Sequence, residues 1–102
     1  MDQAGALMAN AVIARHLRIY GRVQGVWYRA WAVETARDLG LTGWVRNRMD
    51  GSVEALAQGA AEAVETFIQR AHDGPPNAEV ARIDVTDAPA EHRHGFDKRS
   101  TC

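Results

Sequence analysis

The chain has 102 residues, of which 46% are hydrophobic and 25% charged, which is the size and composition of one ordinary globular domain. Its formal net charge is -1, so no overall attraction draws it to a nucleic-acid backbone or an anionic membrane, and any anion must be bound locally. Cys102 is the only cysteine, which excludes an internal disulfide framework and favours a reducing, cytoplasmic location.

The first fourteen residues, MDQAGALMANAVIA, are apolar enough to suggest a secretory signal. Asp2, however, stands where a signal has its positive segment, and no clear polar cleavage region follows. We therefore predict a flexible extension over residues 1–14 and one folded domain over residues 15–102. No apolar run approaches the roughly 20 residues that a membrane-crossing helix needs, so we expect no membrane partner.

The first predicted strand covers residues 15–23, RHLRIYGRV, where Leu17 and Ile19 alternate with polar residues. A loop flanked by glycines follows. Apolar residues then recur at spacings of three and four from Tyr28 to Leu39, which predicts an amphipathic helix. Gly40 stands where a left-handed residue commonly ends a helix.

A hairpin is predicted over residues 41–59, LTGWVRNRMDGSVEALAQG. Asp50 and Gly51 would supply the two positive backbone angles of a two-residue turn. A second amphipathic helix is predicted from about Ala60 to His72, where the sequence DGPPN ends it.

The remainder of the chain predicts a fourth strand over residues 78–87 and a short edge strand around Phe96. The step from Val80 to Ile83 breaks strict alternation, as a β-bulge would. The resulting order is strand, helix, strand, strand, helix, strand. This order predicts an α+β fold, the ferredoxin-like βαββαβ sandwich, with an antiparallel sheet and two helices on one face.

In this fold the first two strands run parallel, so their carboxyl ends and the start of the first helix lie at one edge of the sheet. The loop over residues 21–27 and Arg29 should therefore lie near Asn47, at the end of the second strand. Alternation puts Asn47 on the same face as Val45. If Val45 lies under the helices, Asn47 points toward the start of the first helix.

Arg29 places a cation where the helix macrodipole is already positive, at a cost of ~0.3–1 kcal/mol. A bound anion would remove this conflict. Gly21 and Gly25 allow the loop to turn its N–H groups inward, and a guanidinium matches two phosphoryl oxygens. On the motif alone, a connector loop with a solvated arginine explains the residues equally well, and Asn47 alone reads better as a turn residue. Their convergence at one edge favours an anion site.

Three segments, GRVQGVWYR, GLTGWVRNRMDGSVEALAQG and GPPNAEVARIDV, closely resemble in order and spacing the acylphosphatase family, small hydrolases of the carboxyl–phosphate bond. The resemblance covers about residues 16–85. It implies a ferredoxin-like fold, an acyl phosphate substrate, inorganic phosphate as product and competitive ligand, and no metal or organic cofactor. It implies that Arg29 holds the phosphate and Asn47 positions a water molecule. It implies a phosphate-binding loop of Gly21, Arg22, Val23, Gln24, Gly25, Val26 and Trp27.

Both ends of the chain depart from the family. The first fourteen residues have no counterpart, and Asp97 and Lys98 follow Phe96 where the family usually has an apolar, alternating final strand. The sequence therefore leaves the packing of the last strand open.

The predicted mechanism requires no strong general acid from the protein, because the carboxylate leaving group departs readily as an anion. No histidine lies in the loop or beside Asn47, and no nucleophile is paired with a base. The hypothesis is that the loop amides and Arg29 stabilise the phosphoryl oxygens while Asn47 orients water for in-line attack. The proton would pass to the substrate itself.

Other residues have competing interpretations. Asp50 is a possible base, but its place before Gly51 favours a turn role. Trp27, Tyr28 and Trp31 are possible stacking residues, although Trp31 lies on the apolar helical stripe. A metal site is a further possibility, but the spacing fits no standard site and we expect the tail to be mobile. Its ligands would be His92, His94 and Cys102.

The main alternative function is an RNA-binding module, because the RRM fold has the same element order. Tyr20 and Trp44 would lie on its open sheet face, but the strands lack an aromatic-rich signature and the net charge is not positive. A second alternative is a non-catalytic anion-binding module, such as a domain that handles carbamoyl phosphate for a larger assembly. We expect a monomeric enzyme with no nucleic-acid partner.

Overall fold

The computed structural model describes residues 11–102, so most of the predicted extension, residues 1–10, lies outside the described part. The first strand begins at Val12, before the predicted domain start at residue 15. The elements are β1 Val12–Arg22, α2 Tyr28–Asp38, β2 Thr42–Asn47, β3 Val53–Ala60, α3 Ala61–Ala71, β4 Glu79–Ala88 and β5 Phe96–Lys98. This order confirms the predicted βαββαβ fold and the short edge strand predicted around Phe96.

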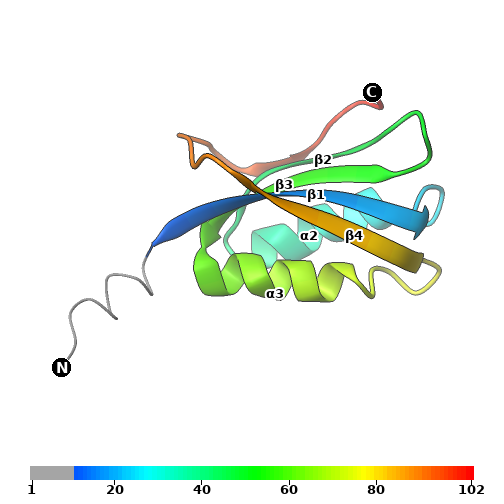
Figure 1. Ribbon diagram of the computed structural model, residues 1–102, viewed down its shortest axis with the longest axis horizontal. Coiled ribbons are helices and arrows are strands. Elements are labelled where there is room, and N and C mark those ends of the chain that lie inside the picture. Colours follow the sequence, from blue (N-terminus) through cyan, green and yellow to red (C-terminus); the bar gives the residue numbers. More distant parts are fainter. Residues whose placement is uncertain (1–10) are drawn as a thin grey trace.

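The sheet has the strand order β4-β1-β3-β2-β5. Both β1 and β2 pair antiparallel with β3, so they run parallel to each other, as predicted. Both helices lie on one face of the sheet (Figure 1). The loop after β1 and the hairpin between β2 and β3 lie at the same end of the molecule, on the right in Figure 1.

The core lies between the sheet and the helices. Leu17 and Ile19 of β1, Val45 of β2 and Phe67 of α3 are each no more than 1% exposed. Phe96 of β5 is also fully buried, and its ring lies 5.9 Å from that of Phe67, centroid to centroid. The packing of the last strand, which the sequence left open, is thus provided by Phe96, a large aromatic side chain that anchors the three-residue strand in the core.

The hairpin turn differs from the prediction. Gly51 has a φ of 92°, but Asp50 is not among the positive-φ residues. The Gly51 N–H donates to the carbonyl of Arg48, and the Arg48 N–H donates to the carbonyl of Ser52. The loop thus has three residues, a turn followed by a left-handed glycine, and needs only one positive φ.

The predicted bulge in β4 is confirmed. Tyr20 pairs with Arg82 and Gly21 with Val80, which leaves Ala81 as the additional residue. A Cβ atom on Gly21 would lie 2.2 Å from the carbonyl oxygen of Glu79. Gly21 is therefore required by the close approach of β4, and also by its own φ of 124°, which other residues rarely adopt.

The C-terminal tail, predicted to be mobile, is hydrogen-bonded along β2. The Arg99 N–H donates to the carbonyl of Val45 and the Cys102 N–H to that of Asn47. The prediction failed because an edge strand offers free backbone groups to any segment that follows β5. No helix within residues 11–102 is long and apolar enough to cross a membrane.

Candidate active site

The predicted residues Arg29 and Asn47 line one cleft of about 320 Å³ at the loop end of the sheet. Arg29 belongs to α2 and Asn47 to β2, and the start of α2 and the end of β2 lie at the same edge of the sheet, as predicted. Of the predicted loop, Gly21 and Arg22 belong to β1 and Val26 is buried in the core. The lining residues are Val23, Gln24, Gly25, Trp27, Tyr28, Arg29, Ala30, Asn47 and Lys98.

The loop carries backbone N–H groups without protein acceptors. Gly25 has a φ of 73° and Trp27 a φ of 69°, and Trp27 is the only non-glycine residue with positive φ among residues 11–102. Within this part of the chain, no N–H of residues 23–28 donates a hydrogen bond to another protein group. Successive donors in a loop that leads into a helix are an arrangement that binds anions.

The start of α2 lacks the usual stabilising groups. Its N-cap residue, Trp27, makes no side-chain capping bond, and no acidic residue lies in the first turn. By contrast, α3 has Glu62 in its first turn. The partial positive charge at the start of α2 is therefore not compensated by a carboxylate of its own first turn.

Arg29 is held loosely. Its Nη1 donates one long hydrogen bond of 3.4 Å to the carbonyl of Arg99, and it belongs to none of the ion pairs of residues 11–102. A guanidinium group has five N–H donors, so most of them are available to a ligand in the cleft.

Asn47 is the last residue of β2, two positions after the buried Val45. Alternation therefore places its side chain on the helix-covered side, as predicted. Its backbone carbonyl accepts a bond from the tail, but its side-chain amide has no hydrogen-bond partner within residues 11–102. The amide is thus free to bind a ligand or a water molecule.

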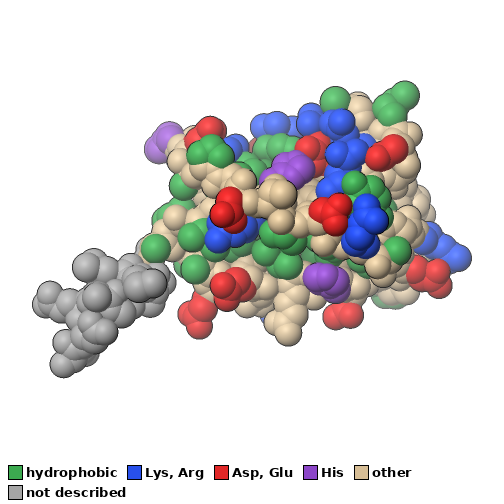
Figure 2. All heavy atoms as spheres, in the orientation of Figure 1, with side chains coloured by type: hydrophobic (Ala, Val, Ile, Leu, Met, Phe, Trp, Pro, Cys, Tyr) green, Lys and Arg blue, Asp and Glu red, His purple; other side chains and the backbone are tan. Residues whose placement is uncertain are grey.

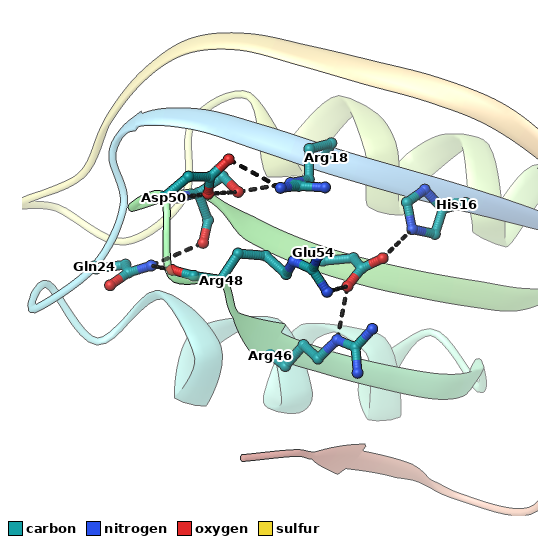
Figure 3. Close-up of polar contacts among 8 residues, drawn as sticks. His16, Arg18, Gln24, Arg46, Arg48, Asp50 and Glu54 are labelled. Carbon is teal, nitrogen blue, oxygen red and sulfur yellow. Dashed lines mark hydrogen bonds and ion pairs between the residues drawn. The ribbon is translucent and has the colours of Figure 1, made fainter. Parts of the chain in front are cut away.

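Gln24 connects the loop to the hairpin that follows Asn47 (Figure 3). Its Nε2 donates to the carbonyls of Arg48 and Ser52, both at 2.8 Å. We had predicted Gln24 only as one member of the loop. Its one sequence signal is a long polar side chain between the apolar Val23 and the second glycine of the loop, Gly25.

Below the hairpin, an ionic cluster joins β1, β2 and β3 on the sheet face that carries no helix (Figure 3). The Glu54 carboxylate accepts from Arg46 Nε at 2.7 Å and from Arg48 Nη1 at 3.3 Å, and it lies 2.5 Å from His16 Nε2. Burial raises the pKa of Glu54, but hydrogen bonds from His16 and Arg46 outweigh it and keep the pKa below its usual value. Lys and Arg side chains gather toward the upper right of Figure 2, the hairpin end of the molecule.

Asp50 belongs to the turn. Its carboxylate accepts bonds from the Ser52 hydroxyl and N–H, and it pairs with Arg18 at 2.9 Å. Hydrogen bonds from Ser52, and then from Arg18, lower the pKa of Asp50 to about 2. A carboxylate of such low basicity, already bonded to the turn, is a poor general base.

The aromatic residues near the cleft have different roles. Tyr28 is 2% exposed and its hydroxyl donates to the carbonyl of Ala71 in α3, so it belongs to the core. Trp31 packs against the same core, whereas Trp27 is 80% exposed.

The aromatic residues of the predicted RNA-binding alternative are already covered by guanidinium groups. The Arg82 guanidinium lies 4.3 Å from the Tyr20 ring centroid, and Arg46 and Arg99 both lie 4.8 Å from the Trp44 ring centroid. These contacts occupy faces on which bases would stack.

Lys98 was not predicted as a site residue. It pairs with Val45 across β2 and β5 and lines the cleft with Arg29 and Asn47. No sequence signal marks it, because its neighbours in the cleft are far away along the chain. Among residues 11–102, no group of three or more His, Cys, Asp or Glu side chains is placed to hold a metal ion.

Comparison with known proteins gives one consistent family. The acylphosphatase family profile matches residues 15–98. An acylphosphatase from Acidovorax sp. is 59% identical over 91 residues, which is 89% of this chain and 94% of the relative. The structure of an acylphosphatase from Coxiella burnetii superposes with a TM-score of 0.84 at 32% identity, covering 88% of this chain and 94% of that one.

One further match is to part of a much longer protein. A structure of full-length HypF superposes with a TM-score of 0.83 at 26% identity, covering 90% of this chain but 12% of that protein. The chain therefore corresponds to nearly the whole length of the acylphosphatases above and to a small segment of HypF.

Proposed function

The chain belongs to the acylphosphatase family and hydrolyses acyl phosphates, and on this premise we propose how its residues divide the work. The N–H groups of residues 23–28 and the Arg29 guanidinium bind the phosphoryl group, and Asn47 positions the attacking water. The observation that carries this proposal is that Arg29 and Asn47 border the same cleft as five of the six residues with unpartnered N–H groups, all but the buried Val26.

The phosphoryl group is the natural ligand of this end of the cleft. The start of α2 contributes partial positive charge and no carboxylate of its own first turn, and Arg29 adds a full charge. A guanidinium fork binds two phosphoryl oxygens at once, so it holds the group in one orientation. These donors also stabilise the charge that spreads over the phosphoryl oxygens in the transition state.

Asn47 suits a water-positioning role because its amide is both donor and acceptor. The carbonyl oxygen accepts a hydrogen bond from water, while the NH₂ group donates one to a phosphoryl oxygen or to the same water. Fixing water in line with the leaving group replaces an encounter by a pre-oriented attack.

No strong general acid is required, because the leaving group is a carboxylate. The carboxylate nearest in sequence to Asn47, Asp50, is bonded to the hairpin turn and has a low pKa. The proton of the attacking water therefore passes to the substrate phosphoryl group. One copy of the chain supplies each of these groups, so we also propose that the enzyme acts as a monomer. Because Cys102 is the only cysteine, we propose that it works in the reducing environment of the cytoplasm.

The experiment compares Arg29→Ala and Asn47→Ala for benzoyl phosphate hydrolysis and for binding of inorganic phosphate. Arg29→Ala should lose phosphate binding and lower kcat/KM by about 10²–10³-fold, as the loss of one transition-state donor does. Asn47→Ala should lower kcat by about 10²-fold and keep the phosphate affinity of the wild type. Equal loss of phosphate binding in both variants would contradict this division of roles.

A further inference from the structure

Lys98 lies at the boundary between the active-site cleft and a second hollow beside α2. Lys98 and Ala30 line both. The second hollow measures about 430 Å³ and is lined by Ala30, Val33, Glu34, Arg37, Asp38 and Lys98. With the phosphoryl group at the loop end of the cleft, as proposed above, the end lined by Lys98 is left for the acyl part of the substrate.

Lys98 is placed there by the fifth strand. Phe96 and Lys98 are two residues apart in β5, and they pair with Gly43 and Val45 of β2. Phe96 is fully buried against the helices, so alternation turns Lys98 toward the same side, at the rim beside Ala30. Anchoring of Phe96 in the core thus fixes where the lysine emerges.

The charge of Lys98 is not neutralised by an ion pair. Within residues 11–102, Lys98 forms none, whereas the neighbouring Arg37 pairs with Asp97 at 3.9 Å. Glu34 and Asp38 line the second hollow but not the active-site cleft. The charged side chains that line the cleft are those of Arg29 and Lys98. The cleft therefore presents two cations to its ligand.

We propose that Lys98 is a specificity-determining residue that recognises an anionic group on the acyl part of the substrate. The proposal rests on the proposed binding of the phosphoryl group by Arg29. It assigns to this enzyme a preference for acyl phosphates that carry a carboxylate on the acyl chain. The phosphoryl dianion binds at Arg29, and the second carboxylate binds the Lys98 ammonium group at the rim.

The test uses two substrates of nearly equal shape, 4-carboxybenzoyl phosphate and 4-carbamoylbenzoyl phosphate, with the ratio of their kcat/KM values as the readout. Their different leaving-group chemistry cancels when the same ratio is compared between variants. Lys98→Gln should lower this ratio about threefold, as expected for loss of an exposed ion pair, and Lys98→Arg should restore it. The wild-type preference should also fall as salt is added.

Arg70→Gln is the matched control, because it removes a cation in the last turn of α3 that does not line the cleft, and it should leave the ratio unchanged. An unchanged ratio in Lys98→Gln, or a ratio that Lys98→Arg fails to restore, would overturn the assignment. Failure of the proposed function has a different result: Arg29→Ala would then hydrolyse both substrates as fast as the wild type.

Discussion

The two ends of α2 differ in their capping hydrogen bonds and in the charges beside them. At its C-terminus, Gly40 adopts a φ of 72°, and the N–H groups of Gly40 and Leu41 donate to the carbonyls of Arg37 and Ala36. This is a complete Schellman cap, with a basic residue in the last turn. At its N-terminus, a left-handed Trp27 replaces a capping residue, and Arg29 opposes the helix dipole.

The difference supports the proposal that the N-terminus of α2 serves ligand binding, because it lacks the stabilising groups that the C-terminus has. Each feature of the C-terminus lowers the free energy of the folded chain by itself. Each feature of the N-terminus becomes favourable only when an anion is present, because the anion accepts from the N–H groups and neutralises Arg29. A site with this property should respond to substitution by losing function without losing stability.

The largest expected effect comes from Arg29→Glu, which gives the helix start the charge that its dipole favours. We expect kcat/KM to fall by at least about 10³-fold, because a carboxylate repels the phosphoryl group. The free energy of unfolding should stay constant or rise by ~0.3–1 kcal/mol. Turnover of benzoyl phosphate and urea unfolding measure the two quantities.

Arg70→Glu makes the same charge reversal at the C-terminus of α3. It should lower stability by ~0.3–1 kcal/mol and leave turnover unchanged. If both reversals were equally destabilising, the start of α2 would not be electrostatically unfavourable and the comparison would fail.

A smaller effect is expected from the glutamine that connects the loop to the hairpin. Gln24→Ala should lower kcat about tenfold, because the loop donors and Asn47 lose their fixed separation. Gln58 serves as the matched control, since its amide also ties a loop to the sheet, through Glu91, outside the active-site cleft. Gln58→Ala should lower the thermal midpoint without changing kcat. Equal kcat values in the two variants would show that Gln24 is only structural.

Two glycines with the same backbone conformation, Gly25 before α2 and Gly40 after it, allow a further test of the difference between the two ends of the helix. Gly25 and Gly40 have φ values of 73° and 72°, and a Cβ atom on either would meet nothing within 4 Å. Replacement of either by alanine should cost about 1–2 kcal/mol of stability from backbone strain alone. Only Gly25→Ala should weaken phosphate binding, severalfold, since Gly25 lines the cleft. Equal phosphate affinities, measured by calorimetry, would place Gly25 outside the site.

The smallest effect concerns the hairpin turn and acid. Because Ser52 and Arg18 lower the pKa of Asp50 from 3.8 to about 2, ionised Asp50 stabilises the fold above its ordinary pKa. This contribution is lost as the pH falls from 3.8 toward 2. Asp50→Asn should therefore be less stable than the wild type at pH 6, and the two should converge near pH 2 in urea unfolding. Turnover at neutral pH should be unchanged, and a large loss would restore the general-base hypothesis.

Much of the fold was predictable because its signals are local. The alternation around Val45 and the helical spacing after Tyr28 each lie within one element, and the irregular step after Val80 indicated the bulge found at Ala81. The turn at Asp50 was predicted incorrectly, because an Asp-Gly pair is compatible with both two-residue and three-residue loops.

The candidate site was predictable in part. That Arg29 and Asn47 lie at one cleft was predictable, because the topology of the βαβ unit fixes which strand ends share an edge. Gln24 was not identified as a connector, because its two acceptors lie 24 and 28 residues further along the chain. The burial of Phe96 and the position of Lys98 depend on a parallel pairing between β2 and β5, which no local sequence pattern predicts.

The sequence by itself determined the order of the elements, the side of each strand that faces the helices, and the family to which the chain belongs. These follow from periodicity, from backbone preferences of glycine and proline, and from motifs within short segments. Only the tertiary structure decided that Gln24 bonds the loop to the hairpin, and that Lys98 of β5 lines the same cleft as Arg29. Such contacts join residues far apart in the chain. They are therefore determined by sheet register and core packing, and not by the local conformational preferences of each segment.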